Sequence, residues 1–280
     1  MKDALLTLAD IAFSPPGAAT TLSGLDLTIG RGEFLAVLGA DGAARDALAL
    51  LVAGVVKPER GEIRHQDQLS VGLVFPSPGQ GLIAATVYEE VSIGLEWQGL
   101  SGAAVAARVR PLLQRFALWD QRHQSPSTLS GGEKQRLAIA ASLALEPSCL
   151  VLNEPVAMLD PGSARSVAAA ARAAAANGRA VLWLSGDAMQ ALIADRVAVM
   201  HGGRIVWQGR PPDLAQQGDK LDAWGLRPLP LAALTESLVR HGLSLAGKAT
   251  TPEALVEEIC SSWRTSTSST MAASPPPGGS

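Results

Sequence analysis

Four short, mainly apolar runs constrain the fold of this chain most strongly. They are Phe34–Leu38, Val71–Phe75, Cys149–Leu152 and Ala180–Leu184. A strand that is covered on both faces of a sheet needs no polar alternation, so such runs are typical of buried strands in α/β proteins. Helical patterns occupy much of the sequence between them. The sequence therefore predicts an α/β fold with a buried sheet core.

Less regular patterns predict further strands and helices before and between these four runs. Residues 4–13 and 21–29 form strands in this prediction, and an apolar helix runs from Ala47 to about Val55. The sequence becomes mainly helical from residue 81 to about 145. An alanine-rich surface helix is expected over residues 163–177, where Asn177 and a glycine end it.

Length and charge exclude several classes of protein. The chain has 280 residues, which is enough for one large α/β domain and a small appendage. A net charge of -3 gives no general reason to expect nucleic acid as a partner. No apolar run approaches the roughly 18 to 20 residues that span a membrane, and Met1-Lys2-Asp3 does not begin a secretory signal. Cys149 and Cys260 fit no metal-ligand spacing, so the sequence indicates no metal site of its own.

The octapeptide from Leu129 to Arg136 carries the strongest functional signal. Ser130 and Glu133 have the spacing of a capping box, which starts a helix. Gly131 and Gly132 then occupy the first helical turn, although each glycine costs about 1 kcal/mol relative to alanine in a helix. They leave a bare helix N-terminus, where free N–H groups and the positive end of the helix dipole can meet a phosphate.

This octapeptide, LSGGEKQR, resembles the signature motif of ABC-type ATPases. The resemblance implies a P-loop NTPase fold with a mixed sheet core and a helical subdomain over about 81–145. In that family the signature binds the γ-phosphate of an ATP held by the opposite subunit of a head-to-tail dimer. The residues expected to serve a partner's ATP are Leu129, Ser130, Gly131, Gly132, Glu133 and Gln135.

The loop after Phe34–Leu38 resembles a P-loop but departs from it at three of four fixed positions. Gly39 is retained, whereas Ala44 replaces the second glycine, Arg45 the lysine and Asp46 the Ser or Thr. The Asp46 carboxylate should repel phosphate by about 1 kcal/mol per charge in water and about 4 at an effective dielectric of 20. We also expect Asp46 to act as an internal anion at the helix N-terminus. The degenerate loop comprises Gly39, Ala40, Asp41, Gly42, Ala43, Ala44, Arg45, Asp46 and Ala47.

Other motifs of the family follow in the same order and spacing. Asn153 stands where the Walker B aspartate would hold magnesium, and Glu154 keeps the position of the general base. Leu159 and Asp160 match the D-loop, which crosses the dimer interface in this family. Pro76 replaces the Q-loop glutamine, Gly186 the switch histidine, and Pro15 an aromatic residue that often stacks on adenine.

The departures fall where a subunit would bind its own ATP, whereas the signature and the D-loop are intact. We therefore expect a heterodimer with one competent site, in which ATP and Mg²⁺ bind at the composite site formed with a second ABC ATPase subunit. The chain's own site should be weak or empty, and Glu154 should be idle. Hydrolysis would then occur only in the heterodimer.

The C-terminal region resembles the extension of energy-coupling-factor ATPases, which drive the uptake of vitamins and transition-metal ions. Residues 225–243 and 251–255 carry this resemblance, as does the segment from Phe75 to Val91. It implies two membrane partners, a coupling subunit and a substrate-binding subunit, and a peripheral location on the cytoplasmic face of the plasma membrane. The predicted division is an ATPase domain over 1–215, a helical module over 216–263 and a disordered tail over 264–280.

Two alternatives stay open at this point. The chain could be a fully active ABC ATPase whose unusual Walker residues have new roles, with Asp46 as a magnesium ligand. It could instead be a regulatory or scaffold protein of the ABC family that takes no part in transport. The sequence shows no second cassette and no long coiled-coil insertion in support of that class.

Overall fold

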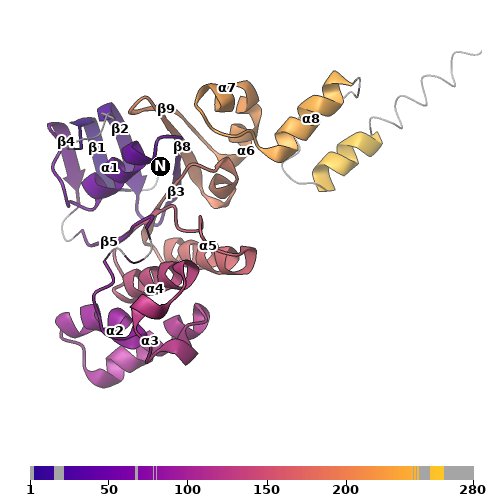
Figure 1. The fold of residues 1–280 in the computed structure, drawn as a ribbon. Helices are drawn as coiled ribbons and strands as arrows, with labels where there is room; N and C mark the ends of the chain where they lie inside the picture. The colour runs from indigo at the N-terminus through magenta and orange to yellow at the C-terminus, as the bar shows by residue number, and fades with distance from the viewer. Residues whose placement is uncertain are drawn as a thin grey trace, which may run out of the picture.

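The structure is a computed structural model, and it describes residues 3–15, 22–66, 69–77, 79, 81–241, 243, 245 and 253–261. It contains a six-stranded sheet in the order β5-β6-β7-β3-β8-β9 and a three-stranded sheet in the order β2-β1-β4 (Figure 1). The strands are β1 (Ala4–Phe13), β2 (Leu22–Gly30), β3 (Phe34–Leu38), β4 (Arg60–His65), β5 (Val71–Val74), β6 (Cys149–Asn153), β7 (Ala180–Ser185), β8 (Arg196–His201) and β9 (Arg204–Gly209).

Three of the four apolar runs form the buried central strands β6, β7 and β3 of the large sheet, as predicted. The fourth, Val71–Phe75, contributes the edge strand β5, in which only alternate residues are buried, so its predicted burial on both faces is wrong. β5, β6, β7, β3 and β8 pair in parallel, and β9 adds an antiparallel edge. Every residue of β3, β6 and β7 is buried. The sequence did not predict β4, β8 or β9. β4 is almost wholly exposed, and its sequence therefore lacks the apolar run that marks the core strands.

The large sheet separates two hydrophobic cores. Alternate residues of β3 point to opposite faces, with Phe34, Ala36 and Leu38 in one core and Leu35 and Val37 in the other. The first core also contains the helical subdomain and the alanine-rich helix, and the second contains the small sheet and the first helix. Two layers packed on one sheet fix the carboxyl ends of its parallel strands, where ligands bind in open α/β folds.

The helices that matter for the site follow the predicted pattern with shifted ends. Against the prediction, the first helix begins at Gly42 rather than Ala47, because Asp41 caps it, and it ends at Val52. The helical region over 81–145 is confirmed as separate helices. The longer helices are α1 (Gly42–Val52), α2 (Val87–Trp97), α3 (Gly102–Arg115), α4 (Gly131–Ala144), α5 (Pro161–Ala176) and α8 (Pro230–Arg240), and the short ones include η1 (Trp119–Gln121), η2 (Pro126–Thr128), η3 (Ala188–Ile193), α6 (Pro211–Leu214), η4 (Ala215–Gln217) and α7 (Gly218–Ala223).

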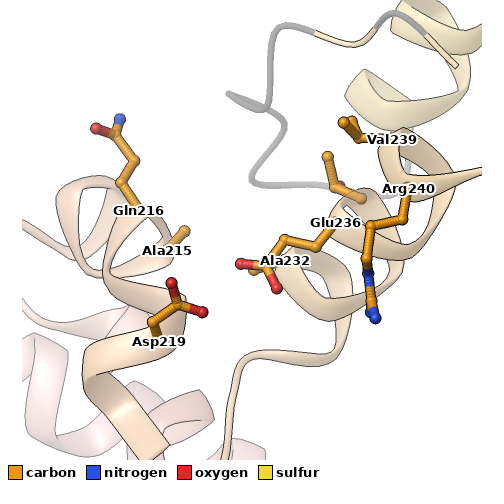
Figure 2. Close-up of a pocket in the computed structure, with 8 residues that line it drawn as sticks. Ala215, Gln216, Asp219, Ala232, Glu236, Val239 and Arg240 are labelled. Atoms are coloured by element: carbon orange, nitrogen blue, oxygen red, sulfur yellow. The ribbon is translucent and has the colours of Figure 1, made fainter. Parts of the chain in front are cut away.

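The C-terminal segment is attached to the sheet core through α7 and the turn after it. Leu221, Leu226 and Leu229 are buried in the first core, whereas α8 and the helical residues 253–261 extend away from the body of the molecule (Figure 1). A cavity of about 570 Å³ separates α8 from η4 and α7, and Figure 2 shows Asp219 and Glu236 on its opposite walls. The predicted tail over 264–280 lies outside the described residues, as do Thr21, Pro78, Gly242, Thr251 and Pro252. Within the part of the chain that the structure describes, no helix is long and apolar enough to cross a membrane.

Gly61 offers a test of the small sheet. Its φ is 91°, and a Cβ added there would clash with the carbonyl oxygens of Ala9 and Asp10, next to an irregularity in the β1–β4 pairing. We expect Gly61→Ala to lower the free energy of unfolding by about 2–4 kcal/mol, from backbone strain and overpacking. The control is Gly102→Ala, which adds a methyl group to open space in α3. Urea denaturation of the two variants should separate them, and equal midpoints would show that Gly61 does not approach the backbone of β1 this closely.

Candidate functional site

The loop between β3 and α1 is held by its own carboxylate. Asp41 is the N-cap of α1, and its Oδ1 accepts hydrogen bonds from the N–H groups of Ala43 at 2.9 Å and Ala44 at 3.3 Å. The prediction that Asp46 supplies the internal anion is therefore wrong, because Asp41, five residues earlier, already does so as the N-cap. Gly39 packs so closely against β8 that a Cβ would lie 3.1 Å from the carbonyl oxygen of Met200. Gly39 is thus required by close packing.

Arg45 fills the space between this loop and the end of β6. Its Nη1 donates to the carbonyl oxygen of Gly39, and its Nη2 lies 2.7 Å from Oε1 of Glu154. The Arg45 residue is only 8% exposed, so the ion pair is largely withdrawn from water. Nε of Arg45 is buried and has no hydrogen-bond partner among the described residues. The guanidinium thus joins the P-loop position to the general-base position within one chain.

Glu154 is held from the opposite side by the end of β7. It has a left-handed φ of 48° directly after β6. Its Oε1 accepts from the N–H group of Gly186 at 2.8 Å, and its Oε2 accepts from Oγ of Ser185 at 3.3 Å. A Cβ on Gly186 would lie 3.4 Å from Nη1 of Arg45. The structure therefore brings Arg45, Glu154 and Gly186 together as predicted, and adds Ser185.

Asp46 and Asn153 form a second contact beside this ion pair. Nδ2 of Asn153 donates to Oδ1 of Asp46 at 2.6 Å. Asn153 is only 2% exposed, whereas Asp46 is exposed. Asn153 thus presents an amide at the position where the resemblance implies a carboxylate, and the carboxylate of this pair belongs to Asp46 on α1. Pro76 follows β5 and is half-buried, and its side chain has no polar atom to offer a ligand.

The signature residues form the capped N-terminus of α4. Oγ of Ser130 accepts from the N–H group of Glu133 at 3.3 Å, and Oε2 of Glu133 accepts from the N–H group of Ser130 at 2.8 Å. The predicted capping box is confirmed. Leu129 is buried, and Gln135 is 1% exposed with neither amide atom hydrogen-bonded among the described residues. Ser130 and Gly131 are exposed, so this helix end is open to a partner.

The D-loop packs against this helix within the same chain. A Cβ on Gly132 would lie 3.2 Å from the carbonyl oxygen of Met158 and 3.4 Å from the Leu159 side chain. This close packing within the chain is by itself a reason for a glycine at this position. Asp160 caps α5 by accepting from the N–H groups of Gly162 at 2.9 Å and Ser163 at 3.0 Å. The hydrogen bonds from Ser163 hold the pKa of Asp160 below its usual range. Met158 stays 59% exposed beside the signature.

Sequence reasoning missed one residue of this region, Gln121 on η1. Its Nε2 donates to Oε1 of Glu133 at 2.6 Å. This bond, together with the hydrogen bonds of the capping box, lowers the pKa of Glu133 to about 2. No sequence signal marks Gln121, since it lies in a polar turn outside every motif. The signature and the Arg45 pair belong to different parts of the molecule, since Figure 1 shows α4 beside α2 and α3 in the lower part and α1 beside the small sheet in the upper part.

Comparison with known proteins agrees with this architecture. The ABC transporter family profile matches residues 22–157. The energy-coupling factor transporter ATP-binding protein EcfA1 of Symbiobacterium thermophilum is 39% identical over 252 residues, covering 85% of this chain and 88% of that protein. EcfA1 of Geobacillus kaustophilus is 33% identical over 273 residues, and the match covers 92% of this chain and 98% of that protein.

Solved structures are similar over the same region. The structure of cbiO1 from Clostridium perfringens, part of the ABC transporter complex cbiONQ, has a TM-score of 0.68 and 28% identity, and the match covers 84% of this chain and 100% of that one. A dimeric ATP-binding cassette bound to ADP and phosphate has a TM-score of 0.66 at 22% identity, which supports the fold alone. The chain belongs to the ABC transporter family of ATP-binding proteins and, within it, to the energy-coupling factor ATP-binding proteins.

Proposed function

We propose that this chain is the degenerate ATPase subunit of a heterodimeric energy-coupling-factor importer. In this proposal it lends the signature at the N-terminus of α4 to ATP held by a second ABC ATPase subunit. The observation that carries the proposal is the ion pair between Arg45 and Glu154, which joins the P-loop position to the general-base position within one chain. The open, capped helix end at Ser130 supports the complementary role.

The residues of the chain's own site do not fit ATP with Mg²⁺. Two of the first three N–H groups of α1, those of Ala43 and Ala44, already donate to Asp41. Arg45 is engaged by Gly39 and Glu154, and Asp46 would bring a carboxylate toward the phosphates. A nucleotide would have to displace a buried ion pair and a helix cap while it met an unfavourable charge. We therefore derive no catalytic step at this site.

The direct test is nucleotide binding to the isolated chain. We expect very weak binding of ATP with Mg²⁺ and no hydrolysis, because the site lacks the lysine, the hydroxyl, the glutamine, the Walker B aspartate and the switch histidine of the family. Isothermal titration calorimetry measures the affinity, and a phosphate-release assay measures the hydrolysis. Submicromolar affinity for the isolated chain would overturn the proposal.

Repair of the loop should need several changes at once. Arg45→Lys alone should not recover binding, because Asp46 still repels the phosphates. The triple variant Arg45→Lys with Ala44→Gly and Asp46→Ser should recover some affinity, and adding Asn153→Asp should recover more by returning the carboxylate to β6. Calorimetry on the isolated variants gives the comparison. Full binding by Arg45→Lys alone would refute the electrostatic explanation.

A second candidate is an active ATPase with Asp46 as a magnesium ligand. The contact between Asp46 and Asn153 favours this candidate. The family pattern has a hydroxyl on the helix after the P-loop and a carboxylate on the Walker B strand, whereas this chain has the carboxylate, Asp46, on the helix and a neutral amide, Asn153, on the strand. The same calorimetric experiment separates the two candidates. The class of ABC proteins without a role in transport draws no support from the relatives, which carry transporter names.

We further propose that the assembly contains a membrane-embedded coupling subunit and a substrate-binding membrane subunit for a vitamin or a metal ion. The chain would then sit peripherally on the cytoplasmic face of the plasma membrane. In this proposal residues 1–215 form the ATPase domain and 216–263 the helical module. The relatives' names support transport and ATP binding. Co-purification followed by identification of the bound chains tests the assembly, and recovery of the chain as a lone homodimer would argue against it.

A further inference from the structure

The signature of this chain contains a carboxylate close to the helix end that is proposed to meet phosphate. Glu133 lies in the first turn of α4, three residues after Ser130. A carboxylate free to turn toward a bound ATP would repel its phosphates. The orientation of this one side chain therefore bears directly on the affinity of the composite site.

Both carboxylate oxygens of Glu133 are held away from such a position. Oε1 accepts from Nε2 of Gln121 at 2.6 Å, and Oε2 accepts from the N–H group of Ser130 at 2.8 Å. Oγ of Ser130 accepts from the N–H group of Glu133, so its own hydroxyl proton stays available for a ligand. Ser130 can thus cap the helix and still donate to a phosphate.

Gln121 is itself fixed by the turn that carries it. Its N–H group donates to the carbonyl oxygen of Leu118 at 3.1 Å. The guanidinium groups of Arg110 and Arg122 lie over the Trp119 ring, at 5.1 Å and 4.6 Å from its centroid. Nη1 of Arg122 also donates to the carbonyl oxygen of Trp119 at 3.0 Å. The cation–π contact with Arg110 fastens η1 to α3, and the contacts of Arg122 brace the turn itself, so they fix the turn from which Gln121 reaches Glu133.

We propose that Gln121 is a positioning residue for the signature, which turns the Glu133 carboxylate away from the partner's ATP and leaves the Ser130 hydroxyl free to donate. The inference rests on the proposed function, because it assumes that α4 meets a nucleotide in the heterodimer. It adds a residue outside the motif to the machinery of the composite site. The lowered pKa of Glu133 agrees with this geometry, since the hydrogen bond from Gln121 is its largest cause.

A charge exchange tests the proposal in the purified heterodimeric complex. Gln121→Glu places two carboxylates at hydrogen-bond distance, and should raise KM for ATP at least tenfold with little change in kcat. The double variant Gln121→Glu with Glu133→Gln restores a carboxylate–amide pair with reversed polarity, and should return KM to within about threefold of the wild type. Gln124→Glu, the same change at an exposed neighbouring position, is the matched control and should leave KM unchanged. An unchanged KM in Gln121→Glu, or no rescue in the double variant, would overturn the proposal.

A measurement on the isolated chain separates this proposal from the proposed function. Carbon-13 NMR of the Glu133 carboxyl should give a pKa of about 2 in the wild type and a clearly higher value in Gln121→Leu. An unchanged pKa of Glu133 in Gln121→Leu would overturn the positioning role of Gln121, regardless of the KM values measured in the complex. If Ser130→Asp also leaves the ATPase rate of the complex intact, the proposed function fails with it. If Ser130→Asp abolishes the rate and Gln121→Glu has no effect, only the positioning role is refuted.

Discussion

Replacing Ser130 with aspartate is expected to lower ATP hydrolysis by the assembled complex by about 10²- to 10³-fold, the range for losing a preorganised donor at a reacting phosphate or oxyanion. Aspartate is as good an N-cap as serine, so α4 should remain folded. The change replaces a hydroxyl donor with a negative charge at an exposed helix end. A steady-state phosphate-release assay on the purified complex measures the effect.

Ser101→Asp is the matched control, because Ser101 caps α3 in the same way by accepting from the N–H group of Ala104. It should leave hydrolysis unchanged. Ser130→Asp is also cleaner than Gly132→Asp, which would press on the carbonyl oxygen of Met158 in its own chain. Normal hydrolysis in Ser130→Asp would show that this signature serves no nucleotide.

Glu154→Gln is expected to destabilise the chain while doing little to catalysis by the complex. The change leaves the Arg45 guanidinium, which is mostly buried, without its counter-charge. We expect a loss of about 3 kcal/mol in the free energy of unfolding, at the low end for breaking a buried pair because Glu154 is partly exposed. Since 1 kcal/mol corresponds to about 2–4 °C at this size, Tm should fall by roughly 6–12 °C.

The control for this variant is Glu62→Gln, which breaks an exposed ion pair with Arg64 and should hardly move Tm. Differential scanning calorimetry of the isolated chains gives both values. In the complex, Glu154→Gln should retain most of the ATPase rate once the amount of folded protein is matched. An unchanged Tm together with a lost rate would instead make Glu154 the general base of an active site.

Strong local signals explain which parts of the fold were predicted. Continuous apolar runs mark strands buried on both faces, so β3, β6 and β7 could be placed from the sequence within a residue. β4 carries no such run, because it lies on the edge of the small sheet with exposed side chains. The start of α1 was misplaced because the capping role of Asp41 competed with the family pattern, in which the loop continues to residue 46.

The sequence motifs identified most residues of the site but could not predict which of these side chains contact one another. The sequence shows that residues 45, 46, 153 and 186 differ from the family pattern. Their contacts with one another arise only because the carboxyl ends of β3, β6 and β7 lie side by side in the folded sheet. Gln121 was invisible, because its role arises only when η1 packs against α4. A contact between two single polar side chains that are distant along the chain produces no periodic pattern in the sequence, so it could not be predicted.

The stoichiometry of bound nucleotide in the purified complex tests the central claim most directly. The proposed complex of this chain with a second ATPase subunit is saturated with a non-hydrolysable ATP analogue and Mg²⁺, and bound nucleotide is then counted per heterodimer. The proposed closure of the chain's own site by Arg45 and Glu154 predicts one tightly bound nucleotide per heterodimer, and Ser130→Asp should weaken its binding. Two nucleotides of similar affinity per heterodimer would contradict the account, because the site after β3 would then be open.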